Sequence, residues 1–195
     1  MSGRRYEVRL SGSGGQGIIM AAILLAEGAA VYGGKQVAQT QSYGPEARGG
    51  ASKAEVVISN EPIDYPKALV QDLLLAMNQA SCDLYSKDIK REGIIIIDST
   101  NVGQPPPGRT IAIPFTGIAR REIGKEFAAN MVALGAVSCL CPEVTEGAVE
   151  AALMARVPPG TRTLNLKAFK TGVKEARKID TAKLRHRYHG EEAEV

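Results

Sequence analysis

Apolar and polar residues alternate along this chain in short runs that are typical of strands, and longer apolar or mixed runs between them are typical of helices. The alternation Glu7–Leu10 predicts a half-buried strand. Gly17–Val31 predicts a buried helix because it is apolar, almost uncharged and free of proline. Gly93–Asp98, with four consecutive isoleucines, predicts a central strand. The other predicted strands are 36–39, 51–59, 73–77 and 110–115, and the other predicted helices are 79–90, 118–140, 145–156 and 165–179.

This alternation of strands and helices predicts an α/β protein with a Rossmann-like three-layer fold, in which helices cover both faces of a mostly parallel sheet. We expect a single domain over residues 1–180 and a charged C-terminal tail over 181–195. Thr145 and Asn165 are expected to cap the last two helices. Small residues in the predicted helix 118–140 would let another helix, of this chain or another, approach closely: Ala128, Ala129, Ala133, Gly135 and Ala136.

A glycine-rich turn joins the first strand to the first helix and is the first candidate binding site. Its candidate residues are Gly12, Gly14, Gly15, Gln16 and Gly17, in which the glycines follow the G-x-G-x-x-G spacing. Free N–H groups at a helix start attract anions, so we expect the turn at the carboxyl edge of the sheet, open to an anion or a partner loop. Valine at position 14 or 17 should disrupt it. The alternative is that the glycines only let the helix pack on the strand.

A second candidate site lies in the polar loop Ser42–Gly50. Tyr43 offers an amphipathic ring, and the guanidinium of Arg48 suits a phosphate or carboxylate. Three glycines in this loop are more than a simple strand connection requires. The alternative is that Arg48 pairs with Glu46 or another nearby acid.

Neither a nicotinamide site nor a catalytic centre is predicted. The region after the second strand, 37–41, lacks the acidic residue that holds a ribose, and no Lys with Ser or Thr follows Gly17 as a P-loop requires. The two histidines, His186 and His189, lie in the charged tail, and we predict no catalytic residue and no metal ligand. Asp98 ends a strand at the edge where α/β sheets bind ligands, but capping of its own loop through Ser99 and Asn101 is favoured.

Composition narrows the class of protein. The chain of 195 residues is 44% hydrophobic and has no run long enough to cross a membrane and no signal peptide, so a cytoplasmic location is expected. Cys82, Cys139 and Cys141 have no cluster-binding or zinc-binding spacing and are expected to be buried thiols.

Residues 156–187 carry ten Lys or Arg and two acids. This excess of positive charge predicts a solvated helix face or a surface for an acidic partner or a nucleotide's phosphates, and not nucleic-acid binding.

Three blocks of the sequence, in order, resemble a known family: Gly12–Ile18, Gln41–Gly50 and Asn130–Ala136. They are similar to the gamma subunit of 2-oxoacid:ferredoxin oxidoreductases, and Tyr43–Gly50 followed by Lys53 looks most like the 2-oxoglutarate type. The resemblance implies a complex with alpha, beta and often delta chains that decarboxylates a 2-oxoacid, forms an acyl-coenzyme A and reduces ferredoxin. It also implies that thiamine diphosphate, Mg²⁺ and the iron–sulfur clusters sit on the other chains, whereas coenzyme A could contact this one.

We therefore expect a required subunit that has no catalytic residues of its own and is inactive when isolated; a homodimer is one state open to the isolated chain. The alternatives are a free-standing nucleotide-binding or scaffolding protein with the same fold and, more distantly, a small NAD-dependent enzyme.

Overall fold

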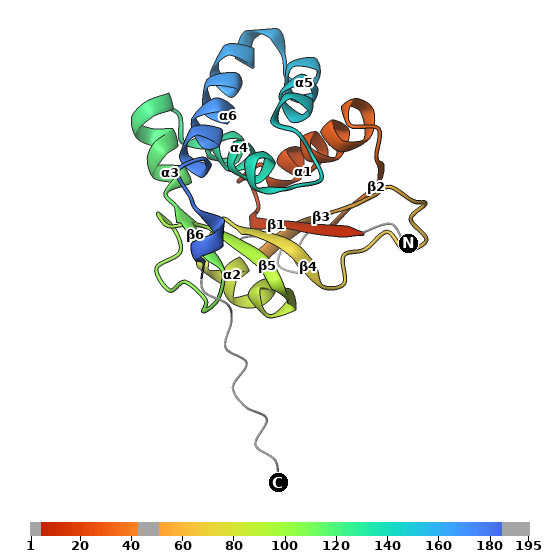
Figure 1. Ribbon diagram of the computed structural model, residues 1–195. Helices are drawn as coiled ribbons and strands as arrows, with labels where there is room; N and C mark the ends of the chain where they lie inside the picture. The colour runs from red at the N-terminus through yellow and green to blue at the C-terminus, as the bar shows by residue number, and fades with distance from the viewer. Residues whose placement is uncertain (1–4, 43–50, 185–195) are drawn as a thin grey trace.

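The computed structural model describes residues 5–42 and 51–184, which form one α/β domain around a six-stranded sheet (Figure 1). The strands stand in the order β2-β3-β1-β4-β5-β6. β3 runs antiparallel to β1 and β2, and β1, β4, β5 and β6 run parallel to one another, so the expected mostly parallel sheet is confirmed. The strands are β1 (Tyr6–Ser13), β2 (Gln36–Ser42), β3 (Ala51–Ser59), β4 (Gln71–Ala76), β5 (Ile89–Asp98) and β6 (Thr110–Ile113).

The helices cover the two faces of the sheet unequally. Figure 1 shows α1, α4, α5 and α6 gathered on one face and α2 on the other. The helices are α1 (Ile18–Glu27), α2 (Gln79–Tyr85), α3 (Phe115–Ile118), α4 (Ala129–Leu140), α5 (Glu146–Arg156) and α6 (Arg162–Ala176). Short π or 3₁₀ turns complete them: η1 (Gly28–Tyr32), η2 (Ser86–Asp88), η3 (Ala119–Ile123), η4 (Glu126–Ala128), η5 (Pro159–Thr161) and η6 (Thr181–Lys183). No helix in the described ranges is both long and apolar enough to cross a membrane.

The hydrophobic core lies mainly between the sheet and the four-helix layer. It includes fully buried side chains from β1, α1, α4 and α6, such as Leu10, Leu24, Leu134 and Phe169. A smaller cluster under α2 contains Leu74, Ala76, Cys82, Ile95, Ile97 and Val102. Burial on both faces explains why Leu73–Ala76 in β4 and Ile94–Ile97 in β5 are continuous apolar runs rather than alternating ones.

The small residues of α4 serve contacts within this chain. A Cβ at Gly135 of α4 would overlap the carbonyl group of Phe169 in α6, and a Cβ at Gly172 of α6 would overlap the carbonyl of Val132 in α4. The two helices therefore cross at backbone contact distance, which only glycine at both positions permits. The small residues were expected to let a helix of this chain or of another approach closely, and the helix that packs there is α6 of this chain.

The predicted continuous helix 118–140 is wrong. α3 passes into the π-helical turn η3, and Gly124 then adopts a left-handed conformation (φ 76°) that ends it. Lys125 is extended, and α4 begins only at Ala129. Glycine is the residue for which this conformation costs no Cβ strain, so the break is located at Gly124.

Two other predicted helix boundaries are also wrong, whereas the Thr145 cap is confirmed. α2 stops at Tyr85, because Ile89 and Lys90 already belong to β5. α6 begins at Arg162, directly after the turn η5, so Asn165 lies within the helix and its amide donates to the Thr161 carbonyl. The Thr145 hydroxyl accepts a hydrogen bond from the Ala148 N–H and caps α5.

Candidate functional site

The glycine-rich turn lies at the carboxyl edge of the sheet, as expected. β1 ends at Ser13, and α1 begins at Ile18 on the four-helix side. Ser13 pairs with Ala51 at the start of β3, and Ser42 at the end of β2 pairs with Lys53. Ser42 and Ala51, the described residues on either side of segment 43–50, are therefore both at this edge. Tyr43 and Arg48, the candidates in that segment, lie outside the described residues.

The turn also lies at the topological switch point of the sheet, where successive helices change from one face of the sheet to the other. The helix that follows β1 covers one face of the sheet, whereas the helix that follows the neighbouring strand β4 covers the other (Figure 1). In open α/β sheets, ligands bind in the crevice outside the carboxyl ends of two strands related in this way. The glycine turn and the residues after β4 form this crevice.

The glycines of the turn have different physical roles. Gly15 (φ 89°) and Gly17 (φ 70°) have left-handed backbones, a conformation that favours glycine. A Cβ at Gly12 would lie 2.5 Å from Gln16 Oε1 and 3.2 Å from Met77 Cβ. Gly14 has neither constraint, because an added Cβ would meet no described atom within 4 Å. Within the described chain nothing would oppose a Cβ at Gly14, so the disruption expected from valine there would have to come from a ligand or a partner chain and stays a prediction.

Two side chains, one from the turn itself and one from α4, hold the turn in place. Gln16 Oε1 accepts a hydrogen bond from the Ser13 N–H (2.7 Å), and its Nε2 donates to the carbonyl of Met77 (3.4 Å). Asn130, in the first turn of α4, donates from Nδ2 to the carbonyl of Gly17 (3.2 Å). The amide of Gln16 thus has a structural task. No side chain among the described residues caps the start of α1, so its first N–H groups have no side-chain acceptor in that part of the chain.

A cleft of about 310 Å³ opens beside the turn. Its lining joins the glycine turn, the end of β4 and the segment before α4: Gly15, Gln16, Met77, Thr116, Glu126, Phe127 and Ala129. Phe127 is 66% exposed, which is unusual for a large apolar side chain. The Glu126 carboxylate forms a two-bond ion pair with Arg120 (2.9 and 3.0 Å), and these hydrogen bonds lower its pKa. The cleft therefore combines an apolar wall, backbone donors and a carboxylate that is already paired.

Asp98 caps its own loop, as favoured from the sequence. The buried carboxylate accepts hydrogen bonds from the Thr100 N–H (3.0 Å), from Asn101 Nδ2 (2.9 Å) and from the Thr116 hydroxyl. Thr100 takes the place predicted for Ser99, whose N–H donates instead to the carbonyl of Ile113. Asp98 thereby fixes Thr116 in the cleft wall and has a structural role.

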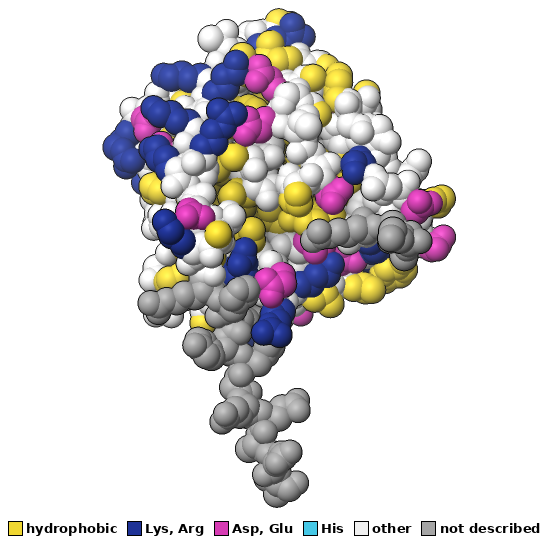
Figure 2. Space-filling view, in the orientation of Figure 1, with side chains coloured by type: hydrophobic (Ala, Val, Ile, Leu, Met, Phe, Trp, Pro, Cys, Tyr) yellow, Lys and Arg dark blue, Asp and Glu magenta, His cyan; other side chains and the backbone are white. Residues whose placement is uncertain are grey.

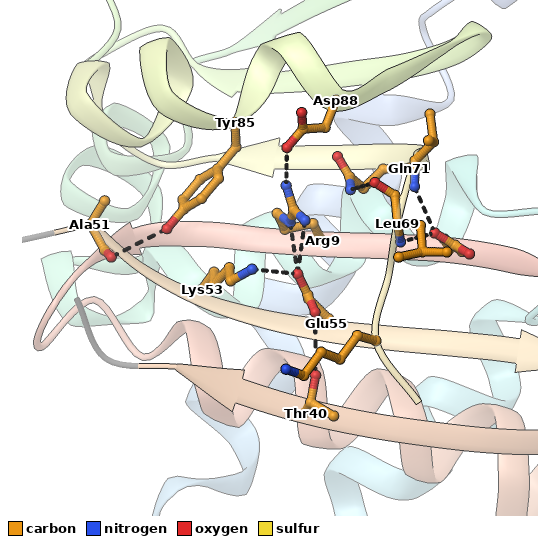
Figure 3. A network of polar contacts seen from close by, with 12 residues as sticks. Arg9, Thr40, Ala51, Lys53, Glu55, Leu69, Gln71, Tyr85 and Asp88 are labelled. Atoms are coloured by element: carbon orange, nitrogen blue, oxygen red, sulfur yellow. Dashed lines mark hydrogen bonds and ion pairs between the residues drawn. The ribbon is translucent and has the colours of Figure 1, made fainter. Parts of the chain in front are cut away.

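A buried charge network behind the carboxyl edge was not predicted (Figure 3). Arg9 of β1 pairs with Glu55 of β3 (2.9 Å), and both side chains are about 95% buried. Arg9 also pairs with Asp88 (3.1 Å) and stacks over the ring of Tyr85, 5.0 Å from its centroid. Lys53 donates to the same Glu55 (2.8 Å). The strand β1 is thus buried on both faces, and the prediction of a half-buried strand is wrong.

Opposing effects act on the Glu55 carboxyl group. Burial raises its pKa, but the hydrogen bond from Lys53 and the charge of Arg9 together lower it below its ordinary value. Burial raises the pKa of Tyr85. Thr40 Oγ1 donates to Glu55 Oε2 (3.3 Å), so the network ties β2 to β3 and, through Arg9, to β1 and α2. An opening of about 280 Å³ adjoins it, lined by Thr40, Gln41, Ser42, Lys53, Glu55 and Lys67.

The cysteines form no redox or metal centre in the described ranges. Cys82 and Cys141 are buried, as expected, and Cys139 is partly exposed. Burial raises the pKa of Cys82 to about 11 and that of Cys141 to about 12, so at neutral pH these thiols are protonated and poorly nucleophilic. Across residues 5–42 and 51–184, no three His, Cys, Asp or Glu side chains are grouped so that they could hold a metal ion.

Comparison with known proteins places the chain in a family. Residues 7–175 match the family described as pyruvate ferredoxin/flavodoxin oxidoreductase. The chain is 48% identical over 179 residues to the 2-oxoglutarate synthase subunit KorC of Methanocaldococcus jannaschii, covering 90% of this chain and 96% of the relative. It is 38% identical to the KorC subunit of Archaeoglobus fulgidus, covering 93% of both chains.

Solved structures agree with this placement. The gamma subunit of a keto/oxoacid ferredoxin oxidoreductase from Geobacter sulfurreducens superposes with a TM-score of 0.83 at 46% identity, covering 90% of this chain and 98% of that one. A 2-oxoglutarate:ferredoxin oxidoreductase from Magnetococcus marinus, with 2-oxoglutarate, coenzyme A and succinyl-CoA bound, superposes with a TM-score of 0.80 at 25% identity. That match covers 91% of this chain and 32% of the longer one. The chain belongs to the pyruvate ferredoxin/flavodoxin oxidoreductase family and has the form of its separate gamma subunit.

Proposed function

We propose that this chain is the gamma subunit of a 2-oxoglutarate:ferredoxin oxidoreductase, which converts 2-oxoglutarate and coenzyme A to succinyl-CoA and CO₂ with reduction of ferredoxin. The observation that carries the proposal is the 48% identity to a 2-oxoglutarate synthase subunit over almost the full length of both chains. Identity to a pyruvate synthase subunit is lower, 29% over 133 residues. The free-standing nucleotide-binding or scaffolding alternative has no support from these relatives.

Under this proposal, thiamine diphosphate, Mg²⁺ and the iron–sulfur clusters belong to alpha, beta and, where present, delta chains. The described residues do not fit these groups, because they offer no set of three metal-ligating side chains and contain only three cysteines, Cys82, Cys139 and Cys141, without cluster-binding spacing. We assign no step of decarboxylation or electron transfer to this chain. We expect the assembled complex in the cytoplasm.

Coenzyme A does fit the carboxyl edge. The uncapped start of α1 offers N–H donors to a phosphate, and the open space at Gly14 and Gly15 lets an anion reach the backbone. Phe127 and Met77 offer an apolar wall for the non-phosphate part of the molecule. Tyr43 and Arg48, whose segment is flanked by Ser42 and Ala51 at this edge, are proposed to contribute a stacking ring and a second phosphate contact. Coenzyme A supplies the thiol that receives the acyl group.

The task of this chain is then to bind and orient. Gln16 and Asn130 fix the conformation of the turn before any ligand arrives, which lowers the entropy cost of binding. The Ser13 and Gln16 N–H groups are hydrogen-bonded inside the turn, so the donors proposed for a ligand are those of the glycines and of the first turn of α1. Phe127 and Met77 would keep water from the ligand's apolar part once a partner chain covers the cleft.

Purification of the tagged chain from its source organism tests the assembly. We expect thiamine-binding and cluster-binding chains to co-purify in fixed stoichiometry, with thiamine diphosphate and iron in the complex and neither in the isolated chain. Recovery of the tagged chain alone, as a stable monomer or homodimer with no partner, would favour the scaffolding alternative.

A further inference from the structure

A row of lysines runs along the exposed face of α6. Lys167, Lys170 and Lys174 are spaced three and four residues apart and are all exposed, so they lie on one side of the helix over about 10 Å. The opposite side is buried against α4 through Ala168, Phe169, Gly172, Val173 and Ala176. Figure 2 shows Lys and Arg side chains concentrated over α6 and the neighbouring segment after α3.

A second set of cations continues this row. The Lys167 ammonium donates to the backbone carbonyl of Glu122 in η3 (2.7 Å), which brings η3 directly alongside α6. Arg121 in η3 and Lys125 after it are both exposed. We call Lys167, Lys170, Lys174, Arg121 and Lys125 the basic surface.

Most cations of the basic surface are not neutralised. Lys170 pairs with Glu150 (3.2 Å). Within the described part of the chain, Arg121, Lys125 and Lys174 have no ion-pair partner, and Lys167 contacts only a backbone carbonyl. Their charges therefore produce a positive field that extends about 8–10 Å into solvent at physiological salt.

The composition of this surface discriminates between kinds of partner. It has no exposed apolar side chain on α6 to enter a membrane, since the exposed positions of that helix are lysines and threonine. Nucleic-acid interfaces are much more uniformly positive than this surface, in which Glu122 and Glu150 lie among the cations. Permanent interfaces are depleted in lysine and have apolar centres. An exposed lysine row without such a centre suits a transient, electrostatically guided protein contact.

We propose that the basic surface guides the acidic electron-accepting protein, ferredoxin, to the assembled complex. This inference rests on the proposed function, in which reduced cofactors on other chains must pass electrons to a protein that arrives and leaves in each catalytic cycle. The basic surface supplies attraction and orientation, and the electrons leave through partner chains. The lysine row of the basic surface lies on α6 in the helix layer, and none of its five cations is among the residues that line the carboxyl-edge cleft, although Lys125 directly precedes the cleft residues Glu126 and Phe127.

Charge reversal in the assembled complex tests the proposal. The variant Lys167→Glu/Lys174→Glu changes two cations that pair with no described carboxylate. The matched control is Lys87→Glu/Arg91→Glu, which makes the same charge change at exposed positions in η2 and β5. We expect the KM for ferredoxin to rise about tenfold in the α6 variant at low ionic strength, and this difference to shrink at high salt. The Lys167→Gln/Lys174→Gln variant should show a smaller rise.

Two further measurements distinguish loss of ferredoxin docking from loss of enzyme activity: reduction of a small electron acceptor and direct binding of ferredoxin. Reduction of methyl viologen with 2-oxoglutarate should be unchanged in every variant, because a small acceptor needs no docking surface. Binding of ferredoxin to the complex, measured by calorimetric titration, should weaken by the same factor as the KM rises, whether or not the complex turns over. Absence of methyl viologen reduction in the unmodified complex would count against the proposed function alone.

The inference would be overturned by an unchanged affinity for ferredoxin, by an equal loss in the control, or by dissociation of the complex in the α6 variant, which would make the surface a subunit interface. Binding of the unmodified complex to duplex DNA or to phosphatidylserine vesicles, lost in the α6 variant while ferredoxin binding persists, would also overturn it.

Discussion

Replacement of Gly17 by alanine separates a structural role of the glycine turn from a binding role. Gly17 caps α1 with φ 70°, and a Cβ there would overlap the amide of Asn130. The left-handed backbone costs about 1–2 kcal/mol for a residue with a Cβ. Rotation of Asn130 out of the way would lose its hydrogen bond to Gly17, worth about 0.5–1.5 kcal/mol. We therefore expect Gly17→Ala to lower the free energy of unfolding by about 2–3 kcal/mol.

Gly14→Ala is the matched control in the same turn. Its Cβ meets no described atom within 4 Å and its φ is not left-handed, so its unfolding free energy should change by no more than about 0.5 kcal/mol. In the complex, however, that methyl group stands where an anion would approach the turn, and the KM for coenzyme A should rise.

Urea denaturation followed by circular dichroism measures both variants, with Asn130→Ala and the Gly17→Ala/Asn130→Ala double variant completing a cycle. The double variant should cost less than the sum of the two single changes, since the same hydrogen bond is lost in each. Equal destabilisation by Gly14→Ala and Gly17→Ala, or an additive cycle, would refute this account of the turn.

Three further changes test other parts of the molecule. Gly172→Ala should destabilise the chain by more than about 2 kcal/mol, because its Cβ would overlap the Val132 carbonyl, whereas Gly147→Ala, exposed and unobstructed in α5, should be neutral or slightly stabilising in the same urea assay. Ionised Glu55 has a lowered pKa in the folded state, so its stabilisation is present above about pH 4.5 and is lost as the pH falls through the lowered value. Glu55→Gln should therefore be less stable at pH 7 and decline less steeply in acid, as thermal melts at several pH values would show; an unchanged pH dependence would contradict this. Arg48→Lys keeps the charge and loses the guanidinium fork, so the KM of the complex for coenzyme A should rise, and an unchanged KM would remove Arg48 from the site.

The sequence predicted elements whose determinants are local. The four isoleucines of β5, the cap at Thr145 and the glycine turn after β1 were all located, because each depends on neighbours within a few residues. The break at Gly124 was missed because a single glycine in a helical pattern is often tolerated, and only the packing of η3 and α4 determines that the chain turns there.

The buried network could not be predicted, because its partners are distant in sequence. Arg9 meets Glu55 and Asp88, which lie 46 and 79 residues away. The alternating charged residues of β1 are typical of a strand with one face in solvent. In the structure, however, α2 and the segment before β4 cover that face. Asn130 and Gly135 are similar cases. Both lie in a block that carried the family resemblance, and the structure assigns them to the Gly17 carbonyl and to the crossing with α6.

We expect this chain to complete a 2-oxoglutarate-specific oxidoreductase, and acceptor reduction by the purified complex checks that claim. The complex purified through the tagged chain is mixed with methyl viologen and coenzyme A, and acceptor reduction is followed with 2-oxoglutarate, pyruvate or 2-oxoisovalerate. We predict reduction with 2-oxoglutarate that requires coenzyme A, far weaker reduction with the other two acids, and none from the isolated chain. Equal or faster reduction with pyruvate, or full activity from partner chains that lack this one, would contradict the claim.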